Sequence, residues 1–204
     1  MIRRDRKVTH YINLVGWEVL SFTARDRVFC DSLSLLVVSH MLGKPLVYLP
    51  GAKSLRRHVI DPVQSIYLTP CNLSKIPQEQ QFILPPEAEI QISEDLRDWI
   101  SKKNGLERIY IGIGSPKQNL LGQKLLEEFD VDIFCVGASI FEIGTSHSII
   151  SWSSGRGFEW LFRAIFKPKR FFYKSLQTVM AIFGIIVSED RRDEFRNFLE
   201  SIHH

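Results

Sequence analysis

The sequence predicts an α/β fold: a Rossmann-like parallel sheet with helices on both faces, followed by a helical C-terminal appendage. Strand-like apolar stretches alternate with helical patterns as far as Phe141, which is the order found in parallel sheets covered on both faces. Beyond Gly157 the patterns are helical only. The 204 residues, 45% of them apolar, suit one such domain with an appendage. We therefore expect a core over residues 1–150 and an appendage over residues 151–204.

The expected elements of the core begin with two strands, residues 7–15 and a second ending near Cys30. A helix follows over residues 32–43, with Ser32 as N-cap and Gly43 just past its end. The remaining elements are expected as follows: a strand or turn at 44–51, a short helix at 52–60, brief strands at 65–70 and 81–86 around a polar loop, a helix at 93–105 capped by Ser93, a strand, turn and helix at 108–129, and a strand at 132–141.

The appendage is expected to contain three helical stretches after a Ser/Gly-rich segment over residues 144–157. The stretches cover residues 158–167, 168–187 and 189–202, with Pro168 breaking the first from the second. The most apolar run, 178–187, is about half the length that spans a bilayer.

Composition excludes several classes of protein. The three cysteines are scattered without metal-ligand spacing, which fits a reducing compartment. The histidines His10, His40, His58 and His147 form no triad or metal pattern, and no nucleophile signature occurs. No nucleic-acid recognition motif is present. Because the basic amino terminus lacks a signal-peptide apolar run, we expect a cytoplasmic protein, with contact to a membrane surface left open.

The stretch RIYIGIGSPKQN, Arg108–Asn119, has the layout of a buried strand, a glycine turn and a helix. Ser115 is expected as N-cap, Pro116 as first helical residue and Gln118 as the capping-box partner. Gly112 and Gly114 let the backbone pass close to another group, and free N–H groups at such a helix start can bind an anion. Two interpretations stay open: a phosphate-holding turn, and a well-capped βα turn. Lys117 stands where a dinucleotide fingerprint has its third glycine.

Two acidic features of the sequence are candidates for a functional site. Asp31 follows an apolar strand and precedes a helix, so it can serve as a general base, or simply assist the cap formed by Ser32. Asp130 and Asp132 form an Asp-x-Asp pattern but precede their strand, whereas a metal site would follow one. We expect no metal there.

Positive charge is concentrated in residues 156–174, which carry six Lys or Arg against one acid, although the whole chain has a net charge of only +3. Four cations follow a 4-3-4 spacing typical of one helical face, with aromatic residues between them: Arg163, Lys167, Arg170 and Lys174. This face is compatible with binding diphosphates, with lying on anionic lipid, or with being a solvated helix surface.

Three stretches in order, IYIGIGSPKQN, FCVGASIFEIG and GFEWLFRAIFKPKRFFYK, resemble the WecG/TagA/CpsF family of bacterial glycosyltransferases, glycosyltransferase family 26. The resemblance runs from about Ile109 to Lys174 and is looser upstream. It implies an enzyme of surface-polysaccharide (capsule) or teichoic-acid synthesis in the cell envelope, peripheral at the inner face of the plasma membrane. Such enzymes transfer an N-acetylmannosamine-type sugar, with inversion, from a UDP donor to a polyprenyl-diphosphate-linked sugar, and no cofactor or metal is expected.

The resemblance also implies roles for individual residues. Asp31 matches the catalytic Asp of the family. The donor-binding positions are Thr9, Asn13, Gly112, Gly114, Lys117 and Gln118. The positions expected to face the donor or lipid diphosphate are Arg163, Arg170 and Lys174. The implied partners are the UDP-sugar donor, the lipid-linked acceptor and the membrane surface, with a homo-oligomer left open and no nucleic acid.

The chain departs from the family pattern at several positions. Departures are Ser32 for a glycine, Asn119 for a glutamate, Ser148–Ile150 for Arg-Ala-Pro, Glu142 for an aspartate, and Tyr48 or Leu49 where an arginine is expected. They motivate an alternative from a different class: a catalytically weak or inactive relative that binds a nucleotide sugar or partners an active transferase at the membrane. A third hypothesis is a peripheral membrane protein in which only the tail matters.

Overall fold

The computed structural model describes residues 6–12, 14, 17–23, 26–49, 64–84, 91–140, 165 and 168–202. Within these ranges the side chains of five residues are not described: Leu33, Ala138, Arg170, Phe171 and Lys174. The helices expected at 52–60 and 158–167, apart from Ile165, and the Ser/Gly-rich segment at 144–157 lie outside the described residues. The core–appendage boundary at residue 150 therefore stays a prediction.

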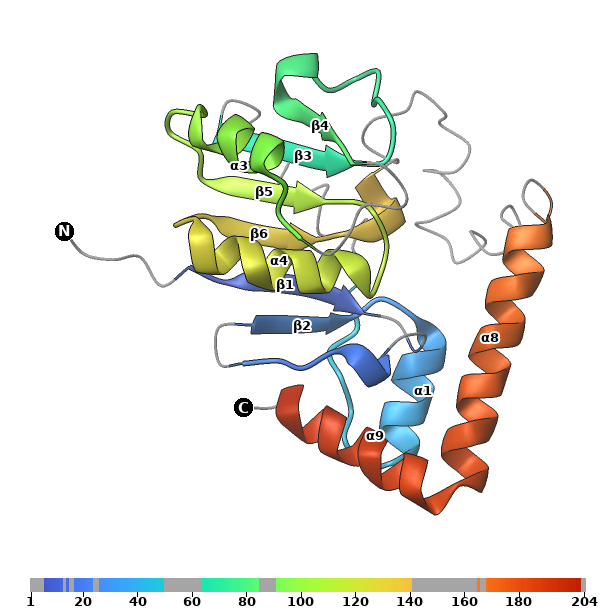
Figure 1. Cartoon of the computed structure of the whole chain (residues 1–204). Helices are drawn as coiled ribbons and strands as arrows, with labels where there is room; N and C mark the ends of the chain where they lie inside the picture. The colour runs from blue at the N-terminus through green and yellow to red at the C-terminus, as the bar shows by residue number, and fades with distance from the viewer. Residues whose placement is uncertain are drawn as a thin grey trace.

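The fold prediction is confirmed: within the described residues, six strands form one parallel sheet in the order β2-β1-β6-β5-β3-β4 (Figure 1). The strands are β1 (Val8–Ile12), β2 (Asp26–Cys30), β3 (Ser65–Thr69), β4 (Gln81–Ile83), β5 (Arg108–Ile111) and β6 (Asp132–Cys135). Because all strands run the same way, their carboxyl ends lie at one edge of the sheet, where open α/β folds bind ligands.

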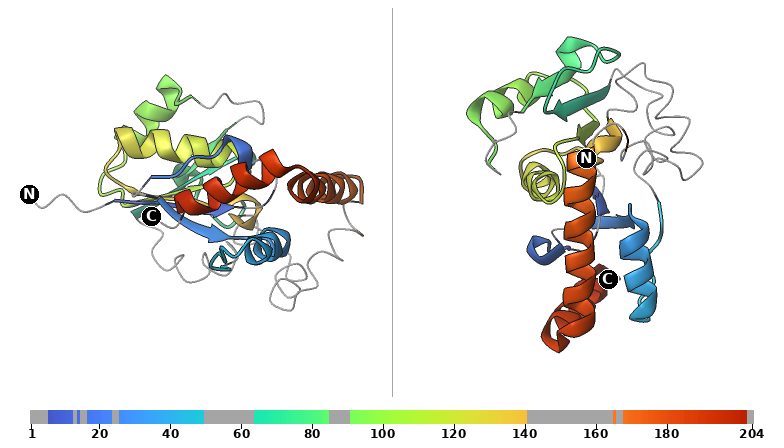
Figure 2. Two further views of the ribbon diagram at one scale, coloured as in Figure 1. Left: turned by 90° about the horizontal axis from the view of Figure 1, so that it is seen from below. Right: turned by 90° about the vertical axis from the view of Figure 1, so that its right-hand side faces the viewer.

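The described helices are α1 (Leu33–Met41), α3 (Glu94–Ser101), α4 (Lys117–Glu128), α8 (Pro168–Val187) and α9 (Glu189–Ile202). Two caps agree with the sequence prediction: the Ser32 hydroxyl accepts from the Leu35 N–H at 3.3 Å, and the Ser93 hydroxyl accepts from the Leu96 N–H at 3.2 Å. Helices α3 and α4 lie on one face of the sheet and α1 on the other (Figure 2).

Three apolar clusters hold these layers together. The first joins the central strands to α3 and α4 through residues such as Ile109, Leu96 and Leu125. The second joins Ile12 to α1, α8 and α9. The third lies on the opposite sheet face from α4 and contains a row of stacked rings, Tyr67, Tyr110 and Phe134, with centroids 5.3 and 5.0 Å apart.

The two C-terminal helices take different positions. Helix α9 lies along the β2 side of the sheet and buries Phe195, Phe198 and Leu199, with Phe195 meeting Trp17 edge-on at 4.8 Å (Figure 1). Helix α8 stands beyond the carboxyl ends of the strands (Figures 1 and 2). Among the described helices, none combines the length and apolarity needed to cross a bilayer.

Candidate functional site

Asp31 lies at the carboxyl edge of the sheet, directly after β2. Its N–H donates to the Ile12 carbonyl at 2.8 Å, which fixes its backbone beside the end of β1. The side chain is half-buried. Burial, with a smaller contribution from the negative charge of Asp31, raises the pKa of Cys30 to about 11, although the hydrogen bond from the thiol to the Ser32 carbonyl acts in the opposite direction. The Asp31 backbone is thus held at the edge where a base was predicted.

The Gly112–Gln118 turn lies at the same edge, after β5. A Cβ on Gly112 would overlap the Ile140 side chain, so this glycine is required by packing within the protein. Gly114 has φ +96°, a conformation that favours glycine, and a Cβ there would meet nothing within 4 Å. At Gly112 the group that approaches the backbone closely is the Ile140 side chain. At Gly114 the glycine is favoured by the positive φ of the turn.

The cap of α4 differs from the prediction. The helix begins at Lys117 with Pro116 at the cap position, and the Ser115 hydroxyl oxygen is buried without a hydrogen-bond partner in the described structure. The side chain of Gln118, rather than that of Ser115, bonds to the backbone of the turn. Its side-chain oxygen accepts from the Gly114 N–H at 3.1 Å, and its amide nitrogen donates to the Cys135 carbonyl at 3.0 Å. The prediction of Ser115 as N-cap was wrong because the side chain of Gln118, only 2% exposed, ties the turn to β6.

The backbone donors at this turn are largely occupied. The N–H of Gly114 donates to Gln118, the N–H of Gln118 to the Gly114 carbonyl at 3.0 Å, and the N–H of Asn119 to the Pro116 carbonyl at 3.0 Å. The expectation of free N–H groups is therefore wrong for these three residues. An anion at this helix start would depend more on side chains, such as exposed Lys117, than on a backbone cradle.

Asp31 and the turn are separated by two strands. In the order β2-β1-β6-β5, Gln118 is anchored on β6, two strands from β2. With neighbouring strands about 4.8 Å apart, Asp31 and this anchor lie about 10 Å apart across the sheet. That span suits a ligand the size of a sugar diphosphate. The segments after Leu49 and Ile140 lie outside the described residues, so a groove between the two points stays a prediction.

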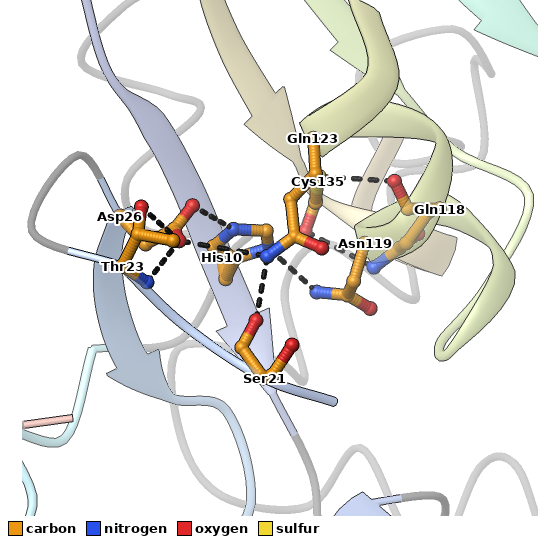
Figure 3. A network of polar contacts seen from close by, with 8 residues as sticks. All are labelled: His10, Ser21, Thr23, Asp26, Gln118, Asn119, Gln123 and Cys135. Atoms are coloured by element: carbon orange, nitrogen blue, oxygen red, sulfur yellow. Dashed lines mark hydrogen bonds and ion pairs between the residues drawn. The ribbon is translucent and has the colours of Figure 1, made fainter. Parts of the chain in front are cut away.

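A buried polar network lies beneath this edge, between β1, β2 and α4 (Figure 3). The His10 Nε2 lies 2.8 Å from the Asp26 Oδ1, and the Asn119 Nδ2 lies 2.9 Å from the His10 Nδ1. His10 and Asn119 are fully buried, and the Asp26 side chain is nearly so. The three side chains form a continuous carboxylate–imidazole–amide chain that joins the edge strand β2 and its neighbour β1 to the first turn of α4.

The geometry assigns hydrogen-bonding roles within the chain. If the Asn119 amide donates to Nδ1, that nitrogen carries no proton, and Nε2–H donates to Asp26. This arrangement places the imidazole between a carboxylate and an amide. Among the described residues the Asn119 Oδ1 has no hydrogen-bond partner, so the network of His10, Asp26 and Asn119 is incompletely satisfied at this atom.

Asp26 is held by further donors. The Thr23 N–H donates to its Oδ2 at 2.6 Å, and the Thr23 hydroxyl donates at 3.1 Å. Burial raises the pKa of Asp26, but hydrogen bonds from His10 and Thr23, with the charge interaction with His10, outweigh burial and lower the pKa below its ordinary value. Asp26 is therefore an ionised anchor of the network.

The comparison with known families gives one result: the model described as Glycosyl transferase WecG/TagA/CpsF family matches residues 85–196, more than half of the chain. The chain belongs to the WecG/TagA/CpsF family. Comparisons with curated proteins and with solved structures gave no match. The matched range includes the Gly112–Gln118 turn and Asn119 but not Asp31. The assignment of Asp31 therefore rests on the looser upstream resemblance and on its position at the sheet edge.

The other residues expected from the WecG/TagA/CpsF resemblance fall into two groups. Thr9 is buried in β1, aligned with Phe134, and by alternation along the strand it faces away from α4; it does not lie with Asp31 at the carboxyl edge. Asn13 and Arg163 lie outside the described residues. Arg170 and Lys174 lie in the first half of α8, and their side chains are not described.

Sequence reasoning missed the buried network. His10 shares one face of β1 with Val8 and Ile12, two residues away on either side, and this period of two does place it on an inward face. Nothing in the sequence shows that β1 pairs with β2 in the register that brings Asp26 beside it, or that α4 lies over both. One feature of the sequence pointed to this region: Asn119 stands where the WecG/TagA/CpsF pattern has a glutamate.

The amino-terminal edge of the sheet provides no comparable arrangement. Asp132 begins β6 and accepts from the Arg6 guanidinium and the Lys7 N–H, both at 3.2 Å, so the Asp-x-Asp pattern lies at the opposite edge from Asp31. A hollow of about 210 Å³ beside Ser65 and Lys103 also lies there, below the usual size of ligand pockets. Among the residues that the structure describes, no cluster of three metal-ligating side chains occurs.

Proposed function

We propose that this member of a glycosyltransferase family is an inverting enzyme of surface-polysaccharide or teichoic-acid synthesis. It moves an N-acetylhexosamine-type sugar, such as N-acetylmannosamine, from a UDP donor to a polyprenyl-diphosphate-linked sugar at the inner face of the plasma membrane. The observation that carries the proposal is the placement of Asp31 and the family's Gly112–Gln118 turn at one edge of the sheet.

In this proposal Asp31 acts as the general base. Its carboxylate accepts the proton of the acceptor hydroxyl while that oxygen attacks the anomeric carbon from the face opposite UDP. The bond from the anomeric carbon to the diphosphate oxygen breaks, and UDP leaves with the bonding electrons. The hydrogen bond from the Asp31 N–H to the Ile12 carbonyl holds the backbone of this residue in place, and positioning is the main contribution that a base residue needs from the fold.

Charge on the departing diphosphate requires cations. Lys117 is exposed at the start of α4, where the helix dipole also favours an anion. Arg163, Arg170 and Lys174 are proposed to contribute from the C-terminal side. Gln118 is proposed to act by holding the donor-binding turn, since both ends of its buried amide are bonded within the protein.

The test is Asp31→Asn with a matched control, Asp130→Asn, an exposed acid at the opposite edge of the sheet. Asp31→Asn is expected to lower transfer from UDP-sugar to lipid-linked acceptor at least 100-fold while calorimetry shows UDP affinity within a few-fold of wild type. Asp130→Asn should leave both unchanged. Unchanged turnover in Asp31→Asn would remove Asp31 from the mechanism.

A second candidate function is a nucleotide-sugar-binding relative without turnover. The observation in its favour is Asn119, which replaces the family's glutamate and is committed to His10 in a buried contact. UDP calorimetry followed by a donor-hydrolysis assay separates the two candidates. Binding of UDP with no turnover across a panel of UDP-sugars and lipid acceptors would favour this second candidate.

A further inference from the structure

The start of helix α4 is attached to the sheet by polar side chains. In its first turn, residues 117–120, the buried side chains are those of Gln118 and Asn119. The buried apolar side chains of the helix, Leu121 and Leu125, come after this turn. Hydrogen bonds depend steeply on angle, whereas apolar packing has no preferred direction. The placement of the helix start therefore depends on two amides.

The two amides bond to neighbouring strands. The Gln118 Nε2 donates to the Cys135 carbonyl of β6 at 3.0 Å, and the Asn119 Nδ2 lies 2.9 Å from the His10 Nδ1 on β1 (Figure 3). One contact alone would let the helix start pivot about it. Two contacts on adjacent strands fix both the rotation of the helix and its position along the sheet.

His10 can act as a fixed point because its own ring is held. Its Nε2 lies 2.8 Å from the Asp26 Oδ1, and both the N–H and the hydroxyl of Thr23 donate to the same carboxylate. The ring is fully buried, with the centroid of the Phe22 ring 4.9 Å away. The contact with Asn119 therefore joins α4 to a part of the sheet that is itself held in place.

The choice of residue at position 119 favours exact placement over stability. An apolar side chain there could fill the space against β1 without removing an amide from water. Among the described residues the Asn119 Oδ1 has no hydrogen-bond partner, which is a further cost of using an amide. Buried polar contacts of this kind permit few arrangements of the groups around them.

The group placed by this contact is the start of the donor-binding turn and helix of the proposed function, on which this inference rests. Lys117 is exposed two residues before Asn119, in the same turn of α4. A misplacement of about 1 Å in a site can lower a rate about 100-fold. We propose that His10 and Asn119 are positioning residues, whose buried contact places Lys117 against the diphosphate of the donor.

The test is the affinity for UDP, measured by calorimetry. Asn119→Ala is expected to raise the dissociation constant about 10-fold. Gln123→Ala removes an amide one turn further along α4, which donates to the Ser21 carbonyl at 2.6 Å. Ser39→Ala removes a buried hydroxyl of α1, which donates to the Leu36 carbonyl at 2.8 Å. Both controls should bind UDP within about 2-fold of wild type. An equal loss of affinity in either control would assign the effect to lowered stability and contradict the inference.

A double-mutant cycle separates positioning from a general loss of structure. If Asn119 acts by placing Lys117, its effect depends on the presence of the lysine. In a Lys117→Ala background, Asn119→Ala should therefore raise the dissociation constant less than about 3-fold. Fully independent effects of the two changes would mean that Asn119 does not act through Lys117, and the inference would fall.

His10→Gln approaches the contact from the other side and serves where Asn119→Ala does not fold. The amide of a glutamine reaches about as far as Nε2 and can keep the contact with Asp26, but it offers no counterpart of Nδ1. This variant should weaken UDP binding as Asn119→Ala does. Unchanged affinity in folded His10→Gln and Asn119→Ala would overturn the inference and leave the proposed function standing. A wild type that binds no UDP would overturn the proposed function and the inference together.

Discussion

At the scale of single residues, the Asp26 carboxylate links the stability of the β1–β2–α4 junction to pH. Its pKa is lowered from an ordinary value of 3.8. A lowered folded-state pKa means that the stabilisation is fully present above about pH 4 and is lost as the pH falls toward the folded-state pKa. Acid should therefore weaken the contact between β2, β1 and α4 before it weakens the apolar clusters.

We predict that Asp26→Asn lowers the free energy of unfolding at pH 7 by about 1–3 kcal/mol, because a buried acceptor of several hydrogen bonds is replaced. The variant should also lose less stability than wild type between pH 5 and pH 3. Urea unfolding at these pH values measures both effects. Asp193→Asn, at an exposed site on α9, is the control. Equal pH dependence of wild type and Asp26→Asn would contradict the role given to this carboxylate.

A second residue-scale prediction concerns the buried contact between Asn119 and His10. Asn119→Ala removes the partner of the His10 Nδ1 and should lower the free energy of unfolding by about 1–3 kcal/mol, because a buried polar atom is left without a hydrogen bond. Urea unfolding at pH 7 measures the loss. An unchanged free energy of unfolding would mean that this contact does not stabilise the junction of β1 and α4.

Some residues of the site could be predicted from the sequence and others could not. Asp31 and Gln118 could be found because each follows a recognisable strand or opens a recognisable helix, and both do lie at the carboxyl edge. The partnership of His10 with Asp26 depends on strand register, and register is set by the whole sheet. The role of Ser115 was predicted wrongly because a side chain four residues from Gly114, that of Gln118, competes for the same turn.

At the scale of elements, the β5–α4 turn should be intolerant at its first glycine. Gly112→Ala is expected to cost about 1–3 kcal/mol, because the new methyl group overlaps Ile140. Gly114→Ala should cost about 1 kcal/mol for its positive φ alone, since the space around it is open. Chemical denaturation of both variants gives the comparison.

The cause can be checked with a double-mutant cycle. The double variant Gly112→Ala with Ile140→Ala should lose less stability than the sum of its two single variants, because the smaller side chain at 140 relieves the overlap, whereas Ile140→Ala combined with Gly114→Ala should be additive. Additive effects in both pairs would mean that Gly112 is required for a reason other than the packing of Ile140.

Helices were predicted more completely than their surroundings. Caps are local, so Ser32 and Ser93 could be assigned from a few neighbouring residues. The stacking of Tyr67, Tyr110 and Phe134 across three strands could not, because it needs the strand order. The parallel sheet was predicted from alternation, but its order, with the last strand β6 beside the first strand β1, was not.

At the scale of the whole molecule, α9 is part of the core, although it was grouped with the appendage in the sequence. We predict that Phe195→Ala costs about 3–5 kcal/mol, because Phe195 is fully buried against Trp17. Asn197→Ala, on the exposed side of the same helix, should be nearly neutral. Thermal unfolding compares the two. Equal midpoints would show that α9 adds little to the stability of the fold.

The burial of α9 also sets an order of events during synthesis. Leu14, Trp17 and Leu20 emerge from the ribosome early, yet their packing partners Phe195, Phe198 and Leu199 are translated more than 170 residues later. Contacts so distant along the chain form slowly, since the loop entropy must be overcome first. Until they form, the nascent polypeptide exposes the apolar residues of this cluster. We therefore expect it to bind chaperones during synthesis and to fold late.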